Sequence, residues 1–382
     1  MNNEKRLVPK LRFPEFTHAW EQRKLGEILK IKSGMSQKNV EDPNGIYPIL
    51  ATGGEIGRTN VALYDKESVL IGRKGTIDKP YYMNTPFWTV DTLFYSELKK
   101  NISGLFVYDL FQIIKWKNYD TSTGVPSLTS STIHNIDVKI PQFQEQQKIG
   151  AFFTALDRYI TIHQRKLENV KKLKAGLLQK MFPKNDQEFP EIRFPEFTYA
   201  WEQRKLGDFI QDYVEKTTVQ NQYPVLTSSQ KQGIILQEDY FADRQIITEN
   251  NVGYFVLPRG LFTYRSRSDN GIFRFNRNDI IEKGIISYFY PVFEIINGDS
   301  NFFLYLLNST IDRQVALEAE GTGQRVLSLK KFKSINIIVP TLQEQQKIGT
   351  FFTALDRYIT IHQRKLENMQ KLKKSLLQQM FV

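Results

Sequence analysis

The chain has 382 residues, 41% of them hydrophobic and 24% charged, which is typical of a folded protein and excludes a mostly disordered or collagen-like chain. It contains no cysteine, so disulfides, thiolate catalysis and cysteine-ligated zinc are excluded. The formal net charge is +11, and an excess of this sign favours a polyanionic partner such as nucleic acid.

The N-terminal segment, Met1–Arg6, is polar and is not followed by an apolar stretch, so we expect no secretory signal. No apolar run in the sequence reaches the roughly 18 residues that a membrane helix needs. We therefore expect a cytoplasmic protein without a membrane partner.

Two stretches of the sequence occur twice. Residues 12–27 match residues 193–208 at 14 of 16 positions, and residues 144–182 match residues 343–381 at 33 of 39 positions. The stretches between them, 28–143 (the first insert) and 209–342 (the second insert), are mostly unlike each other. The two inserts show a weaker sequence similarity near their C-terminal ends, where Thr123-Gly124 corresponds to Thr322-Gly323. A nearly constant frame thus carries two different inserts.

This pattern divides the chain into four parts. We expect globular segments over 1–143 and 183–342, and long helices over 144–182 and 343–382. Each insert is long enough to bury its own core, and both have the mixed strand and helix pattern of an α+β fold.

In the first insert the pattern predicts strands at Tyr47–Ala51, Ser68–Ile71, Thr89–Tyr95 and Asp137–Ile140, and a helix over 104–118. Its candidate DNA-binding residues stand next to glycines, where the backbone can approach a phosphate closely. They are Arg58, Arg73 and Lys74.

The repeated helices carry an apolar stripe with alternating steps of four and three residues, which is typical of a coiled coil. In the first copy the stripe comprises Ile149, Phe153, Leu156, Ile160, His163, Leu167, Val170 and Leu177. In the second copy it comprises Ile348, Phe352, Leu355, Ile359, His362, Leu366, Met369 and Leu376. The nearest partner for each stripe is the other copy, and the sequence leaves their relative direction open. It also leaves open whether the two histidines set the register, respond to pH or are merely tolerated; two histidines alone make a poor metal site.

In the second insert we expect strands at Tyr223–Leu226, Gly260–Tyr264, Gly271–Phe275 and Ile335–Val339, and a helix over 300–319. Arginines and aromatic residues alternate over 258–277. The arginines are candidate contacts to phosphates and guanine edges, although each alone also fits a solvated surface, and the aromatics also fit core packing. The candidates are Arg259, Arg265, Arg267, Arg274 and Arg277.

Catalytic motifs are missing from the sequence. It has no P-loop, no G-x-G-x-x-G and no Asn- or Asp-Pro-Pro-aromatic loop of the kind that base-flipping amino-methyltransferases carry. We therefore expect a non-catalytic chain with no metal site of its own.

Most of the positive charge lies on the repeated helices, which contribute +9 of the +11. The lysines near the helix C-termini also suit the helix dipole without any DNA. The net charge therefore describes the helices more than the inserts, which are nearly neutral.

The repeated helix QEQQKI…FFTALDRYITIHQRKLE…LKxxLLQ and the motif RFPEF…WEQRKLG[ED] that opens each half resemble the specificity subunits of type I restriction-modification systems. The IGRKG turn over Ile71–Gly75 is also similar to the first insert of that family. The resemblance covers nearly the whole chain.

The resemblance implies two target-recognition domains on double-stranded DNA, joined by an antiparallel coiled coil with pseudo-twofold symmetry. It also implies methyltransferase subunits and a translocating restriction subunit as partners, which hold S-adenosylmethionine, ATP and magnesium. Because the inserts differ, we expect an asymmetric site of two unlike halves. A stand-alone DNA-binding regulator, a coiled-coil scaffold without a DNA role and a fused modifying enzyme are the alternatives.

Overall fold

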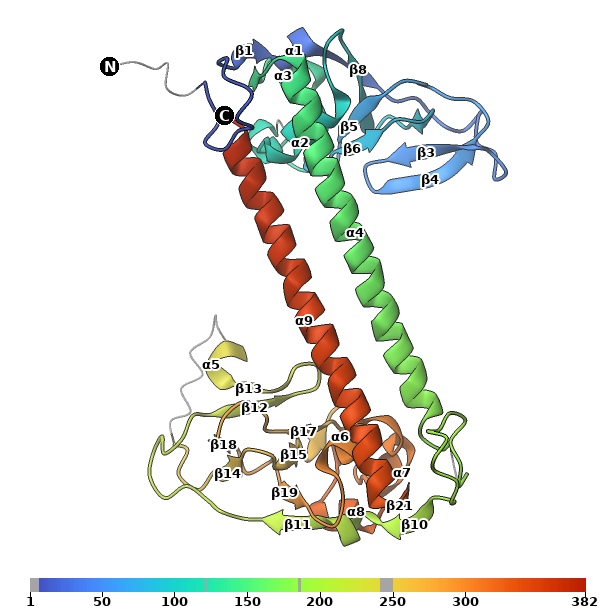
Figure 1. Ribbon diagram of the computed structural model, residues 1–382, viewed down its shortest axis with the longest axis vertical. Coiled ribbons are helices and arrows are strands. Elements are labelled where there is room, and N and C mark those ends of the chain that lie inside the picture. The colour runs from blue at the N-terminus through green and yellow to red at the C-terminus, as the bar shows by residue number, and fades with distance from the viewer. Residues whose placement is uncertain (1–6, 121, 185–186, 241–249) are drawn as a thin grey trace. The chain divides into compact units, whose positions relative to one another are not determined.

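The computed structural model describes residues 7–120, 122–184, 187–240 and 250–382, so Met1–Arg6 lies outside the described residues. The chain divides into two compact units, one formed by residues 1–165 with 363–382 and the other by residues 166–362. Each unit therefore combines one globular segment with one end of each long helix (Figure 1).

The two long helices are α4 (Phe143–Lys180) and α9 (Leu342–Met380), close to the predicted ranges. Pro183 follows the end of α4, and a proline cannot continue a helix. Within the first unit, Asp157 of α4 pairs with Lys373 of α9, while Phe153 lies near Phe381. Residue numbers therefore increase along α4 as they decrease along the facing part of α9, so the two helices run antiparallel in this unit.

The same arrangement holds within the second unit, where Lys174 of α4 pairs with Asp356 of α9 and Phe182 lies near Phe352. The direction that the sequence left open, and that the resemblance implied to be antiparallel, is thus seen in each unit. The predicted α+β class with long antiparallel helices is confirmed.

The first globular segment begins with β1, which pairs with the distant strand β9 directly before α4. Its elements are β1 (Glu21–Lys24), α1 (Leu25–Ile28), β2 (Leu29–Ser33), β3 (Tyr47–Ala51), β4 (Gly54–Thr59), β5 (Ser68–Gly72), β6 (Tyr81–Met83), β7 (Trp88–Thr89), β8 (Leu93–Leu98), α2 (Gly104–Ile113), the 3-10 helix η2 (Trp116–Tyr119), α3 (Ser130–His134) and β9 (Asp137–Ile140).

The second globular segment repeats this order with a few more short strands. Its elements are β10 (Glu202–Lys205), the 3-10 helix η3 (Leu206–Phe209), β11 (Ile210–Tyr213), β12 (Leu226–Ser229), β13 (Gly233–Leu236), α5 (Gln237–Tyr240), β14 (Phe255–Pro258), β15 (Phe262–Tyr264), β16 (Arg267–Ser268), β17 (Phe275–Arg277), β18 (Lys283–Ile286), β19 (Val292–Ile295), α6 (Ser300–Ser309), α7 (Asp312–Glu318), β20 (Arg325–Val326), α8 (Leu329–Ser334) and β21 (Asn336–Val339).

The two inserts share one sheet topology despite their unlike sequences. The first insert has a four-stranded sheet in the order β2-β8-β5-β6, and the second has β11-β19-β15-β17, both antiparallel throughout. A hairpin stands beside each sheet, β3–β4 in the first insert and β12–β13 in the second. A parallel contact is made at the leading strand of each hairpin, by Ile49 of β3 with Trp88 and by Val225, directly before β12, with Ile285. The inserts are therefore two versions of one fold.

Several predicted elements are shifted or interrupted in the structure. The helix expected over 104–118 ends at Ile113 and resumes as η2, where Trp116 donates its indole N–H to the Phe111 carbonyl at 2.8 Å. The helix expected over 300–319 breaks into α6 and α7 at Thr310-Ile311, two β-branched residues that disfavour helix. The strand expected over Thr89–Tyr95 divides at a turn in which Leu93 N–H bonds the Val90 carbonyl.

Each unit has an aromatic core where the sheet, a short helix and the long helices meet. In the first unit Trp20, Phe106, Phe153 and Phe381 pack together, and all four are buried. Burial of such side chains contributes about 1.5–3 kcal/mol each. No helix in the described part of the chain is long and apolar enough to cross a membrane.

Candidate nucleic-acid interface

A buried carboxylate at the start of α4 fixes the opening motif onto the helix. Glu145 accepts two hydrogen bonds from the Arg12 guanidinium, both at 2.7 Å, and one from the Trp20 indole N–H at 3.2 Å. Its side chain is 1% exposed. Such a bidentate pair is geometrically specific, so the globular segment is held in a defined orientation on α4.

The same arrangement recurs at the start of α9. Glu344 accepts from Arg193 at 2.8 and 2.7 Å and from the Trp201 indole N–H at 3.3 Å. The backbone next to each arginine also bonds the C-terminal end of the other helix: Leu11 N–H to the Gln379 carbonyl, and Ile192 N–H to the Lys180 carbonyl, both at 2.9 Å. The repeated motif therefore ties the beginning of one long helix to the end of the other within each unit.

Sequence reasoning missed this network, although a signal was present. The arginine and tryptophan recur 181 residues apart and the glutamate 199 residues apart, all within the nearly identical stretches. Charged residues that stay constant while whole inserts change are candidates for buried pairs.

The residues of the predicted helical stripe are all buried or partly buried, and the structure adds ion pairs between the two helices. The lysine that follows Val170 in the stripe, Lys174, contacts Asp356 at 2.5 Å, and its equivalent Lys373 contacts Asp157 at 2.7 Å. His163 and His362 are half-buried, and each ring packs on the tyrosine four residues earlier, at 4.2 and 4.1 Å between centroids.

One buried acid lies near the Asp157–Lys373 ion pair. Asp109 of α2 is 2% exposed, and desolvation raises its pKa to about 8, with Lys373 lowering and Asp157 raising it. Its Oδ1 accepts from Gln112 at 3.2 Å, while its Oδ2 has no hydrogen-bond partner among the described residues. The carboxyl is therefore mostly protonated near neutral pH.

The second insert contains a polar hollow of about 730 Å³ between the β12–β13 hairpin and the β16–β17 region. Three of the predicted arginines line it, Arg265, Arg267 and Arg274. Guanidinium, amide and hydroxyl groups can form hydrogen bonds with phosphates and base edges. The other polar residues of the hollow, which sequence reasoning did not single out, include Gln230, Lys231, Gln232, Asn270 and Asn276.

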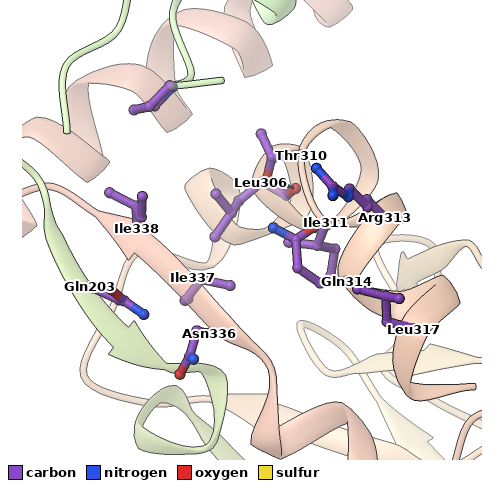
Figure 2. Close-up of a pocket in the computed structure, with 11 residues that line it drawn as sticks. Gln203, Leu306, Thr310, Ile311, Arg313, Gln314, Leu317, Asn336, Ile337 and Ile338 are labelled. Carbon is purple, nitrogen blue, oxygen red and sulfur yellow. Dashed lines mark hydrogen bonds between the residues drawn. The ribbon is translucent and has the colours of Figure 1, made fainter. Parts of the chain in front are cut away.

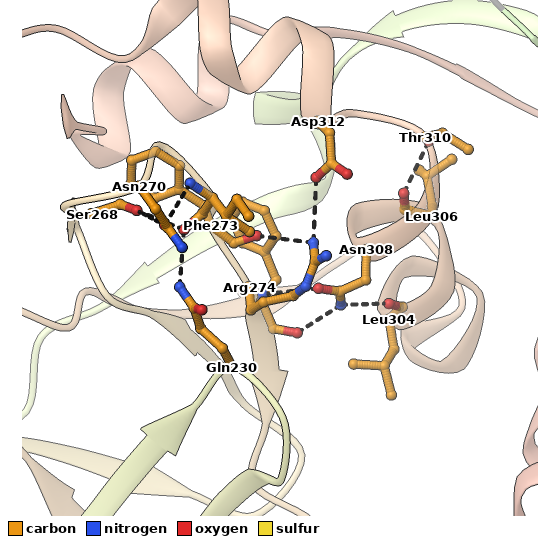
Figure 3. A network of polar contacts seen from close by, with 12 residues as sticks. Gln230, Ser268, Asn270, Phe273, Arg274, Leu304, Leu306, Asn308, Thr310 and Asp312 are labelled. Carbon is orange, nitrogen blue, oxygen red and sulfur yellow. Dashed lines mark hydrogen bonds and ion pairs between the residues drawn. The ribbon is translucent and has the colours of Figure 1, made fainter. Parts of the chain in front are cut away.

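Hydrogen bonds order the edge of this hollow (Figure 3). Gln230 donates to the Ile272 carbonyl at 3.3 Å, which joins the hairpin tip to the loop before β17. Arg274 makes a 3.4 Å ion pair with Asp312 at the start of α7. This arginine is therefore partly neutralised, whereas Arg267 stacks over the Phe289 ring at 4.7 Å and is exposed.

The other two predicted arginines of the second insert lie elsewhere. Arg277 is largely buried and bonds Asp279, Ser300 and Asn301 at the start of α6. Arg259 pairs with Glu282 at 2.7 Å and lies before β15, at the other end of that strand from Arg265. The interleaved aromatics Phe262, Tyr264, Phe273 and Phe275 are all core residues, so core packing accounts for them.

In the first insert the predicted basic residues stand on two neighbouring features. Arg58 lies on β4 of the hairpin, where it pairs with Glu55 at 3.1 Å. Arg73 and Lys74 directly follow β5, and Arg73 donates to the Asp91 carbonyl at 3.3 Å. Lys74 is exposed.

A smaller hollow of about 290 Å³ lies between α6, α7 and the β10–β21 pair (Figure 2). Amide side chains of Gln203, Gln314 and Asn336 lie on it with apolar residues such as Ile337 and Leu306. It contains none of the predicted DNA-binding residues.

A sequence profile of the type I restriction modification DNA specificity domain matches residues 18–172 and again residues 199–371. These two matches cover most of the chain and fall on its two halves. The chain belongs to the type I restriction-modification specificity family. Members of this family are non-catalytic DNA-recognition subunits, so the expectation of a non-enzymatic chain that recognises specific DNA sequences is confirmed.

Curated relatives match nearly the whole length of the chain. The type I restriction enzyme MjaVIII specificity subunit of Methanocaldococcus jannaschii is 22% identical over 403 residues, covering 96% of this chain and 92% of the relative. The putative type I restriction enzyme MjaX specificity subunit of the same organism is 23% identical, covering 95% and 93%.

A solved structure shares the fold. The S subunit of a type I restriction-modification system from M. genitalium superposes with a TM-score of 0.63 at 16% identity, covering 98% of this chain and 99% of that one. The two chains therefore share one fold at low sequence identity.

Proposed function

We propose that the chain reads an asymmetric, bipartite site on double-stranded DNA, one half with each insert, and directs partner methyltransferase and restriction subunits to it. The observation that carries the proposal is the recurrence of one sheet-and-hairpin arrangement in two inserts of unlike sequence. Two identical readers related by a twofold axis read a palindrome. Two readers with one fold and different side chains read two unlike half-sites.

For the second half-site, we assign DNA contact to the exposed groups of the large hollow, Arg265, Arg267 and Lys231, with Arg274 at its edge. Arg277 and Arg259 are assigned structural roles, because they do not line the hollow and acidic side chains already pair with them. For the first half-site the candidates remain Arg58, Arg73 and Lys74.

The proposal keeps target-recognition domains over 1–143 and 183–342 and connecting helices over 144–182 and 343–382. The partner subunits would hold S-adenosylmethionine, ATP and magnesium, while this chain supplies recognition. We also propose that this chain, which binds DNA without reacting with it, acts in the cytoplasm.

The test is methylome sequencing of cells with and without this chain. We expect one methylated motif, with two unlike halves separated by a gap of unspecified sequence, to disappear when the chain is deleted. A palindromic motif, or no motif that depends on the chain, would contradict the proposal.

The rival reading, a stand-alone DNA-binding regulator, is not favoured by the family match. Affinity purification of the tagged chain separates the two. We expect a methyltransferase subunit in stoichiometric amount, whereas a regulator would be recovered without one and would bind its site tightly alone.

A further inference from the structure

Lys74 and Arg267 occupy the same position in the two inserts, although the sequences around them differ. Leu128 N–H bonds the Arg73 carbonyl at 2.9 Å, and its equivalent Leu327 bonds the Ser266 carbonyl at 2.9 Å. In each insert, the residue after that carbonyl then forms an antiparallel β-bridge with the residue before the leucine. These bridges join Lys74 to Ser127 and Arg267 to Val326. Leu128 and Leu327, like Ser127 and Val326, are 199 residues apart, the offset of the long repeat.

The surroundings confirm this equivalence. Lys74 follows β5 and Arg267 follows β15, which are the corresponding strands of the two four-stranded sheets. The local sequences differ, IGRKG in one insert and TYRSRS in the other. A basic side chain thus recurs at one structural position where the neighbouring residues do not.

Both side chains are exposed and unneutralised within the described part of the chain. Neither Lys74 nor Arg267 forms an ion pair or a side-chain hydrogen bond there. By contrast, Arg58, Arg259, Arg274 and Arg277 each have a carboxylate partner. A cation without an internal partner keeps its full charge for a ligand.

Each of the two basic residues lies beside a loop that contains the sequence Thr-Gly. Lys74 lies beside the first Thr-Gly loop, residues 122–128, and Arg267 beside the second, residues 320–327. Gly124 and Gly323 are exposed, and a Cβ built at either would meet nothing within 4 Å. Exposed glycine and threonine let a phosphate approach backbone N–H and hydroxyl groups closely.

The two loops are ordered by different means. In the first, Asp120 accepts hydrogen bonds from the N–H groups of Ser122 and Ser127 at 3.0 and 2.9 Å. In the second, the Arg325 guanidinium donates to the Ala316 and Gly321 carbonyls at 2.6 and 3.2 Å. The Thr-Gly turn and its adjacent cation are kept while the internal supports change, which indicates a role outside the fold.

We propose that Lys74 and Arg267, each beside its Thr-Gly turn, are a matched pair of phosphate contacts that hold the DNA backbone in the same way in both half-sites. This rests on the proposed function and assigns base reading to other groups. A phosphate contact carries no sequence information, so it can stay constant while the hairpins and the rest of each hollow change.

The test compares the full-length chain, assembled with its methyltransferase subunits, as wild type, K74A, R267A and the double variant. Binding is measured on a duplex carrying the methylome-derived site and on an unrelated duplex of equal length, across a salt series. The logarithm of the binding constant falls linearly with the logarithm of the salt concentration, and each lost phosphate contact makes this slope shallower by about 0.9. Raising the salt concentration fourfold should therefore reduce the affinity of a single variant about 3.5-fold less than that of the wild type, and the affinity of the double variant about 12-fold less. Both duplexes should lose affinity by similar factors, and the methylated motif should stay unchanged.

Lys100→Ala is the matched control, since Lys100 is exposed and follows β8 at the opposite end of the sheet from Lys74. It should keep the wild-type slope, and the charge-preserving K74R and R267K should keep it too. An unchanged slope in the double variant, or a motif altered in one half, would overturn the inference. If the wild-type complex itself methylates no bipartite site, the proposed function fails instead.

Discussion

Glu145 and Glu344 are buried carboxylates that each hold one arginine and one tryptophan, and this makes them the most sensitive acidic positions in the frame. Replacing either by glutamine leaves a buried guanidinium without its counter-charge, which costs about 3–5 kcal/mol. We expect E145Q and E344Q each to lower the free energy of unfolding by about 3–5 kcal/mol, measured by urea denaturation.

The exposed acids Glu15 and Glu196, which pair with Lys148 and Lys347, supply the controls. The variants E15Q and E196Q should each lower the free energy of unfolding by less than about 1 kcal/mol. Equal losses in all four variants would contradict the assignment.

Asp109 makes a pH-dependent contribution to stability. Its carboxyl has a pKa of about 8 in the folded chain because of burial, whereas an unfolded aspartate ionises near pH 4. Between these values the folded state binds one proton more than the unfolded state, so stability falls as pH rises. We expect D109N to remove this fall and to gain about 2–4 kcal/mol relative to wild type between pH 5 and pH 8, measured by urea unfolding at both pH values.

The control lies at the equivalent position of α6. The caps Ser103 and Asp299 each accept from the N–H three residues on, so Asp109 corresponds to Tyr305. Tyr305 donates its hydroxyl to Asp356 at 2.8 Å. Y305F should change stability by the same amount at both pH values; if D109N does so as well, the Asp109 carboxyl is not protonated in the folded chain.

At this scale the sequence could locate basic residues but could not say which were already neutralised. Arg267 and Arg277 look alike in the string RSRSDNGIFRFNR, yet one is exposed and the other is bonded to Asp279, Ser300 and Asn301. The difference depends on β17 meeting the start of α6, a contact between segments more than twenty residues apart.

The β12–β13 hairpin is the element we expect to read bases in the second half-site. Its tip, Gln230-Lys231-Gln232, is exposed at the edge of the large hollow, and amide side chains can pair with adenine edges as lysine does with guanine. Replacing all three by alanine should relax or change the bases methylated in one half of the motif only. Methylome sequencing of the variant checks this, and a change in both halves, or in neither, would contradict it.

The long helices could be predicted from the sequence, whereas the pairing of the short strands could not. The helices α4 and α9 were predictable because a long stripe repeats every seven residues and both copies carry it. The shared sheet was not, because its strands are three to six residues long and their partners are remote, as with β2 and β8 or β11 and β19. Short strands show little periodicity, and different side chains can fill one topology equally well.

Over the whole molecule, the spacing of ion pairs links the lengths of the two helices. The pairs Asp157–Lys373 and Lys174–Asp356 are separated by 17 residues on α4 and by 17 residues on α9. A deletion in one helix alone would make these spacings unequal and force one pair apart. A change in length must therefore be made in both helices together, and it must preserve the seven-residue phase of the stripe.

We therefore predict the effect of removing one heptad from each helix, residues 158–164 from α4 and the equivalent residues 357–363 from α9. Seven helical residues span about 10.5 Å, which is about three base pairs of DNA at 3.4 Å each. If the helices set the distance between the half-sites, the methylated motif should keep both halves and lose about three base pairs from its gap. Deleting three residues from each helix is the control, because it rotates the stripe out of phase and should abolish methylation. A gap of unchanged length in the heptad variant would show that something other than helix length spaces the two half-sites.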